Sequence, residues 1–395
     1  MKQVTCQVTV ALLLIFIFLL PEAHASPNTQ SPLPDELTEA QLKSLDMSEL
    51  MSFWDSLSQK YGGFLPESQK GSLYDFLKGD KQFSLKEWGK GFLKFAFHEF
   101  IANGKLLGSL ILLTVFSMFL QSLQNSFEKS TISKVAYSIV FMVLVILALN
   151  SFHIVIQFAN ETIRTMTSFI LALIPLLLGL IASSGGVVSA AFFHPVVLFL
   201  MNTSGVLIEH IVLPLLFLSV LLSIVSTMSE QYKVSQLASL LRNWSIGLLG
   251  IFLTVFLGVL SVQGVSTAVS DGIAIRTAKF VTGNFVPVIG RAFTDAADTV
   301  IGASVLLKNT VGLAGVAVLL IIAAFPAIKI LMIAFIYKFA AAILQPLGGG
   351  PIISCLDTVG KSIIYVFASL GIVSLMFFLC ITVIVAAGNI TMMMR

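Results

Sequence analysis

The chain has 395 residues, of which 57% are hydrophobic and only 11% are charged. Together with a mean hydropathy of +0.97, this composition excludes an ordinary water-soluble domain. The formal net charge of +3 is too small and too scattered to form a basic binding face, which excludes DNA or RNA as a partner. We therefore expect an all-α, polytopic membrane protein embedded in the lipid bilayer.

Residues 1–25 have the pattern of a cleavable signal peptide. Lys2 supplies a positive start, Val8 to Leu20 form a short apolar core, and the segment ends in a small-x-small pattern. We expect cleavage between Ala25 and Ser26. The alternative is an uncleaved first transmembrane helix, although the apolar core is short for a span of about 20 residues.

Residues 26–100 are expected to form a helical leader outside the cytoplasm. Charged side chains alternate with apolar residues such as Leu50, Trp54 and Leu57 at near-helical spacing. The leader is either a solvated segment or a docking platform for a partner. Residues 101–395 then form the polytopic transmembrane domain.

Six apolar runs of this domain are long enough to cross a bilayer. They are Gly104–Leu123, Val135–Phe158, Leu207–Met228, Ile246–Gly264, Ala327–Leu347 and Ser362–Ala387.

Four less regular apolar stretches lie between these runs, and each could span, re-enter or lie along the interface. They are Thr165–Ser184, Val187–Val206, Phe280–Ala297 and Val300–Phe325. Candidate helix breaks are Pro175, Gly185 with Gly186, Pro195, Pro287, Gly290 and a glycine turn at Gly349. Breaks at membrane depth are tolerated only where neighbouring groups bury them or where they line a wet cavity. They therefore indicate a pathway or a binding site, and simple kinks are the alternative.

A weak internal repeat relates parts of the domain. Ile163-Arg164-Thr165 lies twelve residues before Pro175, and Ile275-Arg276-Thr277 lies twelve residues before Pro287. Three related helical hairpins are therefore a hypothesis. If the leader is outside, the connections that hold Lys129, Lys134 and Lys233 lie inside, as positive-inside sorting prefers.

No catalytic or cofactor-binding pattern is visible. The histidines are widely separated, no Cys-x-x-Cys pair occurs, and the glycines at 348–350 lack the Lys and Ser or Thr of a phosphate-binding loop. We therefore expect no metal, no cofactor and no enzymatic activity.

The densest polar group flanks the segment from Gly283 to Gly290. It comprises Asn284, Pro287, Arg291, Asp295, Asp298, Lys308 and Asn309. Charges at membrane depth are unfavourable unless they are paired or hydrated, so the group is either a structural ion-pair cluster or a conduit lining and partner contact. Glu209 and His210 are either an interfacial pair or a proton-linked site.

Three short motifs resemble the stage III sporulation protein AE family of endospore-forming bacilli. They are Phe285-Val286-Pro287-Val288-Ile289-Gly290, Asp295-Ala296-Ala297-Asp298-Thr299-Val300 and Leu306-Leu307-Lys308-Asn309, and they follow a signal peptide and an acidic leader that contains tryptophan. The resemblance runs through nearly the whole chain.

That resemblance implies a multi-pass protein of the mother-cell membrane around the forespore, with its leader outside the mother-cell cytoplasm. Its implied partners are other stage III A membrane proteins and a forespore membrane protein, in a secretion-like channel that supports forespore growth and late sigma-factor activity. Small residues at helix surfaces also permit a homo-oligomer. The alternative function is a small-solute permease built from broken helices.

Overall fold

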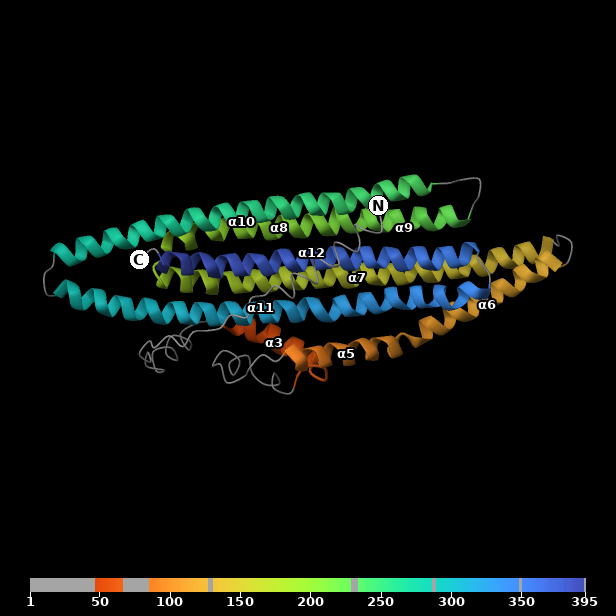
Figure 1. Cartoon of the computed structure of the whole chain (residues 1–395), viewed down its shortest axis with the longest axis horizontal. Coiled ribbons are helices and arrows are strands. Elements are labelled where there is room, and N and C mark those ends of the chain that lie inside the picture. Colours follow the sequence, from red (N-terminus) through yellow and green to blue (C-terminus); the bar gives the residue numbers. More distant parts are fainter. Residues whose placement is uncertain are drawn as a thin grey trace.

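The computed structural model describes residues 47–66, 85–126, 131–228, 234–285, 289–347 and 350–393. Within these ranges all regular secondary structure is helical, and the long helices lie side by side in one elongated bundle (Figure 1). The structure thus confirms the all-α class.

In the described part of the chain, two leader helices precede the long helices. The elements are α3 Ser48–Tyr61, α5 Leu85–Ala102, α6 Gly104–Ser126, α7 Thr131–Ser183, α8 Val187–Leu207, the π turn η2 Ile208–Val212, α9 Leu213–Met228, α10 Ser235–Phe285, α11 Ile289–Leu344, the 3-10 turn η3 Gln345–Leu347 and α12 Pro351–Met393.

Among the described residues, six helical segments are long and apolar enough to cross a membrane. They are Gly104–Ser122, Val135–Ser183, Val187–Thr227, Ser235–Ala274, Ile301–Leu344 and Pro351–Ala387. The longest helix, α11, has 56 residues. At the α-helical rise of about 1.5 Å per residue it extends about 80 Å, far more than the hydrocarbon core of about 30 Å.

Three of the four less regular apolar stretches prove to be extensions of the six spans, and the fourth, Phe280–Ala297, is described only in part. Thr165–Ser184 continues α7, Val187–Val206 continues through η2 into α9, and Val300–Phe325 belongs to α11. The helix breaks expected at Pro175 and Pro195 are wrong in this respect, because both prolines lie inside continuous helices. Gly290 lies in the first turn of α11, whereas Pro287 and Gly349 lie outside the described residues.

The break expected at Gly185 with Gly186 is a true reversal of the chain. Gly185 adopts φ 95°, a left-handed conformation in which a side chain would be strained. A Cβ at Gly186 would lie 2.6 Å from Ile181 Cγ2, so this glycine allows close packing. The turn joins α7 to α8 as an antiparallel pair.

An acidic side chain from α10 caps the N-terminus of α8. The Asp271 carboxylate accepts hydrogen bonds from the Val188 amide at 2.8 Å and from the Ser189 amide at 3.0 Å. The first amides of a helix have no partner within it and carry partial positive charge, which explains why a buried carboxylate is stable there.

The last helix, α12, packs against α7, α9, α10 and α11. Glycine permits the closest contacts: a Cβ at Gly312 would lie 2.4 Å from Val385 Cγ2, and one at Gly315 would lie 2.5 Å from Leu173 Cδ2. The pairs α6–α7, α9–α10 and α11–α12 all reverse at one end of the bundle (Figure 1). That these three pairs are related repeats stays a hypothesis.

Candidate functional site: a charged belt at mid-bundle

Charged side chains converge on a short stretch of α7, from Phe158 to Arg164. This stretch lies near the middle of the 53-residue helix. The groups that meet it come from α3, α5, η2 and α11. We name them the charged belt: Lys60, Glu99, Glu161, Arg164, Glu209 and Lys329.

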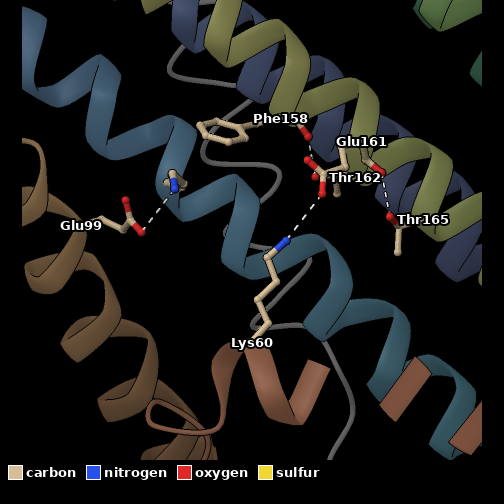
Figure 2. Close-up of polar contacts among 7 residues, drawn as sticks. Lys60, Glu99, Phe158, Glu161, Thr162 and Thr165 are labelled. Atoms are coloured by element: carbon tan, nitrogen blue, oxygen red, sulfur yellow. Dashed lines mark hydrogen bonds and ion pairs between the residues drawn. The ribbon is translucent and has the colours of Figure 1, made fainter. Parts of the chain in front are cut away.

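The leader helix α3 reaches the belt through its last turn. Lys60 Nζ lies 3.6 Å from Glu161 Oε1 (Figure 2). Next to it, the Tyr61 ring stacks on Phe325 of α11 with the centroids 4.2 Å apart and the planes 5° apart. Because Lys60 and Glu161 are 59% and 66% exposed, the aromatic stack contributes more to docking than the ion pair does.

A second ion pair joins α5 to α11. Lys329 Nζ lies 3.7 Å from Glu99 Oε1 and 4.5 Å from the centre of the Phe158 ring (Figure 2). The ammonium group thus lies between a carboxylate and an aromatic face, and both attract a positive charge. Pro326, one turn earlier on α11, has no amide hydrogen, so the Ile322 carbonyl receives no helical hydrogen bond from it.

The third ion pair joins α7 to the π turn η2. Arg164 Nε donates to Glu209 Oε2 at 3.0 Å, and Arg164 Nη2 donates to Glu209 Oε1. The two parallel bonds form the bidentate geometry that makes arginine–carboxylate pairs directional.

A π turn presents Glu209. The Leu213 amide donates to the Ile208 carbonyl five residues back rather than four. Pro214 follows directly, and because it has no amide hydrogen and would crowd the His210 carbonyl, the wider turn relieves the helix there. The proline therefore determines where the carboxylate projects.

A pocket of about 200 Å³ lies between these pairs, under the last turn of α3. Its lining includes Lys60, Tyr61, Phe158, Glu161, Thr165 and Lys329. Burial, followed by the nearby Glu161 and Glu99 carboxylates, raises the pKa of Tyr61 to about 12. The phenol is therefore a neutral hydrogen-bond donor at neutral pH.

The chemistry of the belt is that of paired charges. Among the described residues, no three His, Cys, Asp or Glu side chains gather as metal ligands. Each described cation of the belt faces a carboxylate, which stabilises contacts between helices without activating a nucleophile.

Comparison with known proteins assigns the chain to a family. Residues 68–388 match the family model described as stage III sporulation protein AE. The chain belongs to the stage III sporulation protein AE family. It is 69% identical over 361 residues to the stage III sporulation protein AE of Bacillus subtilis (strain 168), which covers 91% of this chain and 90% of that protein. No solved structure matches it.

The family match contains most of the charged belt. Glu99, Glu161, Arg164, Glu209 and Lys329 lie within residues 68–388, whereas Lys60 precedes them. The resemblance inferred from the three motifs is thereby confirmed, and the chain is a sporulation protein with membrane helices.

The polar group predicted from the sequence is described only in part. Lys308 is fully buried, and its Nζ donates to Asn389 Oδ1 of α12 at 2.7 Å. The buried Asn309 Oδ1 accepts no hydrogen bond from the described residues. Pro287 and the side chains of Asn284, Arg291, Asp295 and Asp298 lie outside what the structure describes, so their convergence stays a prediction.

Sequence reasoning identified Glu209 but not its partner, and it missed Lys60, Glu99, Glu161 and Lys329 as a group. One signal was present. Arg164 and Glu209 enclose 44 residues, Thr165 to Ile208, without an Asp, Glu, Lys or Arg. Charged residues at the two ends of such a long apolar segment indicate where the helices leave the hydrocarbon.

Proposed function

We propose that this chain is a non-enzymatic membrane component of the channel complex that links the mother cell with the forespore. The match of residues 68–388 to the stage III sporulation protein AE family is the observation that carries this proposal. The protein would lie in the mother-cell membrane around the forespore, with its leader outside the mother-cell cytoplasm.

The partners are other stage III A membrane proteins and a forespore membrane protein. A leader anchored on the bundle supports such a role, because α3 and α5 present a fixed surface rather than a free tail. Phe95 of α5 also meets Phe325, with the ring centroids 4.9 Å apart. The complex would support forespore growth and late forespore sigma-factor activity.

Sporulating cells that produce Lys308→Met or Asp295→Asn in place of the wild-type chain test this proposal. Methionine preserves most of the volume of the buried Lys308 side chain but removes its charge. Lys105→Met, at an exposed lysine of α6, is the matched control. The readouts are late forespore gene expression and co-recovery of the partners, after equal accumulation has been shown.

If the chain is a channel component, Lys308→Met should lower late forespore gene expression at least several-fold, whereas Lys105→Met should not. Loss of expression with intact assembly would place Lys308 in the conduit, and loss of assembly would make it a partner or packing site. Normal expression and assembly in both Lys308→Met and Asp295→Asn would contradict a functional role for the polar group.

The alternative function is a small-solute permease, which the pocket of about 200 Å³ at the belt favours. A secondary transporter binds its substrate at such a polar interruption of long helices. Solute uptake by the purified chain alone in liposomes would support the permease. Dependence of transport on the other stage III A proteins would support the channel.

A further inference from the structure

The pocket under the last turn of α3 lies between three helices that are far apart in the chain. Its lining residues come from α3, α7 and α11, and its volume is about 200 Å³. Cavities of about 150 Å³ in other proteins hold a molecule the size of benzene. The pocket is therefore large enough for a small organic molecule as well as for water.

Two lysines of the pocket are only loosely paired. Lys60 Nζ lies 3.6 Å from Glu161 Oε1, and Lys329 Nζ lies 3.7 Å from Glu99 Oε1. A hydrogen bond between an ammonium and a carboxylate measures about 2.7–2.9 Å, so neither pair is hydrogen-bonded. Because a lysine carries three N–H donors, both ammonium groups have donors available for an anion in the pocket.

The α7 wall of the pocket offers acceptors instead of donors. Thr162 Oγ1 donates to the Phe158 carbonyl at 2.6 Å, and Thr165 Oγ1 donates to the Glu161 carbonyl at 2.8 Å (Figure 2). A hydroxyl has one hydrogen to donate, so both threonine oxygens can only accept further hydrogen bonds. The Glu161 carboxylate beside them is an acceptor too. A ligand that satisfies this wall must bring N–H or O–H donors.

An acceptor without a donor lies on the same turn of α7. Among the described residues, the buried Asn160 Oδ1 has no hydrogen-bond partner. Asn160 lines an open groove that shares Glu161 and Thr165 with the pocket, so the groove adjoins it. Arg164 also lines the groove, but its guanidinium is held by Glu209. On this side, too, acceptors are left for a ligand that donates.

The rest of the lining is largely apolar. Leu57 of α3, Phe158 of α7, and Ile322 and Pro326 of α11 complete it. An apolar side chain of a ligand can pack against this part, while its charged groups meet the lysines and Glu161.

We propose that the pocket binds a zwitterion with a primary ammonium, such as a free α-amino acid with an apolar side chain. The anionic group of the ligand pairs with Lys60 and Lys329. The ammonium donates to the Glu161 carboxylate and to Thr165 Oγ1. An anion alone would meet the Glu161 carboxylate and an amine alone would meet two lysines, so a ligand with both charges suits the lining best.

The head group of phosphatidylethanolamine carries the same two charges and is the second possible source of this chemistry. The proposal goes beyond the channel function and does not require transport, since a component of a complex can bind a ligand that it does not move alone.

Binding to the purified full-length chain in an uncharged maltoside detergent tests the ligand class. The probe is radiolabelled L-leucine in equilibrium dialysis, with unlabelled leucine, isocaproate and isoamylamine as competitors. Isocaproate is leucine without its ammonium, and isoamylamine is leucine without its carboxylate. We expect leucine to displace the probe at concentrations at least several-fold lower than either analogue.

Two substitutions locate the binding in the pocket. Lys60→Gln and Glu161→Gln each remove one charge from an exposed side chain, so neither should disturb the fold. Each should weaken leucine binding at least several-fold, because a charge-assisted hydrogen bond is lost. Lys105→Gln and Glu49→Gln remove exposed charges outside the pocket, and these matched controls should leave binding unchanged.

Nanodiscs distinguish the two sources of the zwitterion. Phosphatidylcholine is the reference lipid, because its quaternary ammonium has no N–H to donate to Glu161. If the pocket takes free amino acids, leucine binding should be equal with and without added phosphatidylethanolamine. If it takes the lipid head group, phosphatidylethanolamine should lower leucine binding and should raise the melting temperature of the wild type more than that of Glu161→Gln.

Equal displacement by leucine and both analogues would overturn the proposal, as would equal leucine binding by the wild type and both pocket variants. Absence of leucine binding, together with no selective effect of phosphatidylethanolamine on the wild type, would overturn it as well. Because the purified chain is measured without its partners and without transport, these results do not depend on the proposed channel function.

Discussion

Tyr61 of the leader stacks on Phe325 of α11, with the two rings nearly parallel. The contact joins a helix outside the predicted spans to the centre of the bundle, and the ion pair of Lys60 with Glu161 lies beside it. The described helix α3 of the leader is therefore packed on the folded domain.

Tyr61→Ala should release α3 from the bundle, because it removes a buried aromatic ring. Truncations of this kind destabilise by about 3–5 kcal/mol. Lys60→Ala should have less than about 1 kcal/mol of effect, because both members of its ion pair are exposed. Hydrogen exchange of the α3 amides in detergent measures both changes, and equal protection in the two variants would show that the stack does not hold the leader.

High pH should weaken the docking of α3 through Tyr61. The pKa of its phenol is raised to about 12, above the ordinary value of 10, so the folded state holds the proton more tightly. The resulting stabilisation is fully present below pH 10 and is lost as the pH rises toward 12. Tyr61→Phe keeps the ring but cannot titrate. The fall in α3 protection between pH 10 and 12 should therefore be smaller in Tyr61→Phe than in the wild type, and identical profiles would contradict the prediction.

Removal of Arg164 should destabilise the bundle more than removal of Lys60. Arg164→Ala leaves the Glu209 carboxylate, only 22% exposed, without its bidentate partner, and we expect a loss of about 1–3 kcal/mol. The exchanged pair Arg164→Glu with Glu209→Arg should recover part of that loss. Thermal unfolding in detergent measures it, and a double variant no more stable than the worse single variant would argue against pairing.

Asp271→Asn should loosen the start of α8. An amide has one acceptor oxygen where the carboxylate has two, and it lacks the charge that favours a helix N-terminus. We expect a loss of about 1–3 kcal/mol, since a charge-assisted hydrogen bond is replaced. Faster amide exchange at Val188 and Ser189 would locate the effect. If the melting temperature fell while amide exchange at these two residues stayed unchanged, the destabilisation would not arise at the start of α8.

The apolar runs of the sequence sufficed to predict an all-helical, multi-pass protein, because backbone groups in hydrocarbon must be satisfied within each helix. They did not reveal the helix ends. Pro175 and Pro195 are both exposed residues inside continuous helices. A proline on an exposed face removes one hydrogen bond without stopping the helix, and a sequence does not show which face it occupies.

The charged belt was harder to predict for a different reason. Lys60, Glu99 and Glu161 are far apart in the chain, and they meet only because α3 and α5 fold back on α7 and α11. Arg164 and Glu209 are brought together by the Gly185 turn and the π turn before Pro214. Sequence spacing within one helix predicts none of these contacts between helices.

The length of α6 also makes the protein sensitive to the lipids around it. This helix begins beside the belt, so a bilayer thicker than α6 would bring acyl chains to Glu99, Glu161 and Lys329, whereas a thinner one would expose apolar side chains of α6. Such hydrophobic mismatch changes free energy by fractions of a kcal/mol per Å. The chain is therefore suited to membranes of one thickness, and reconstitution in lipids of graded acyl length should give maximal thermal stability at a single intermediate length.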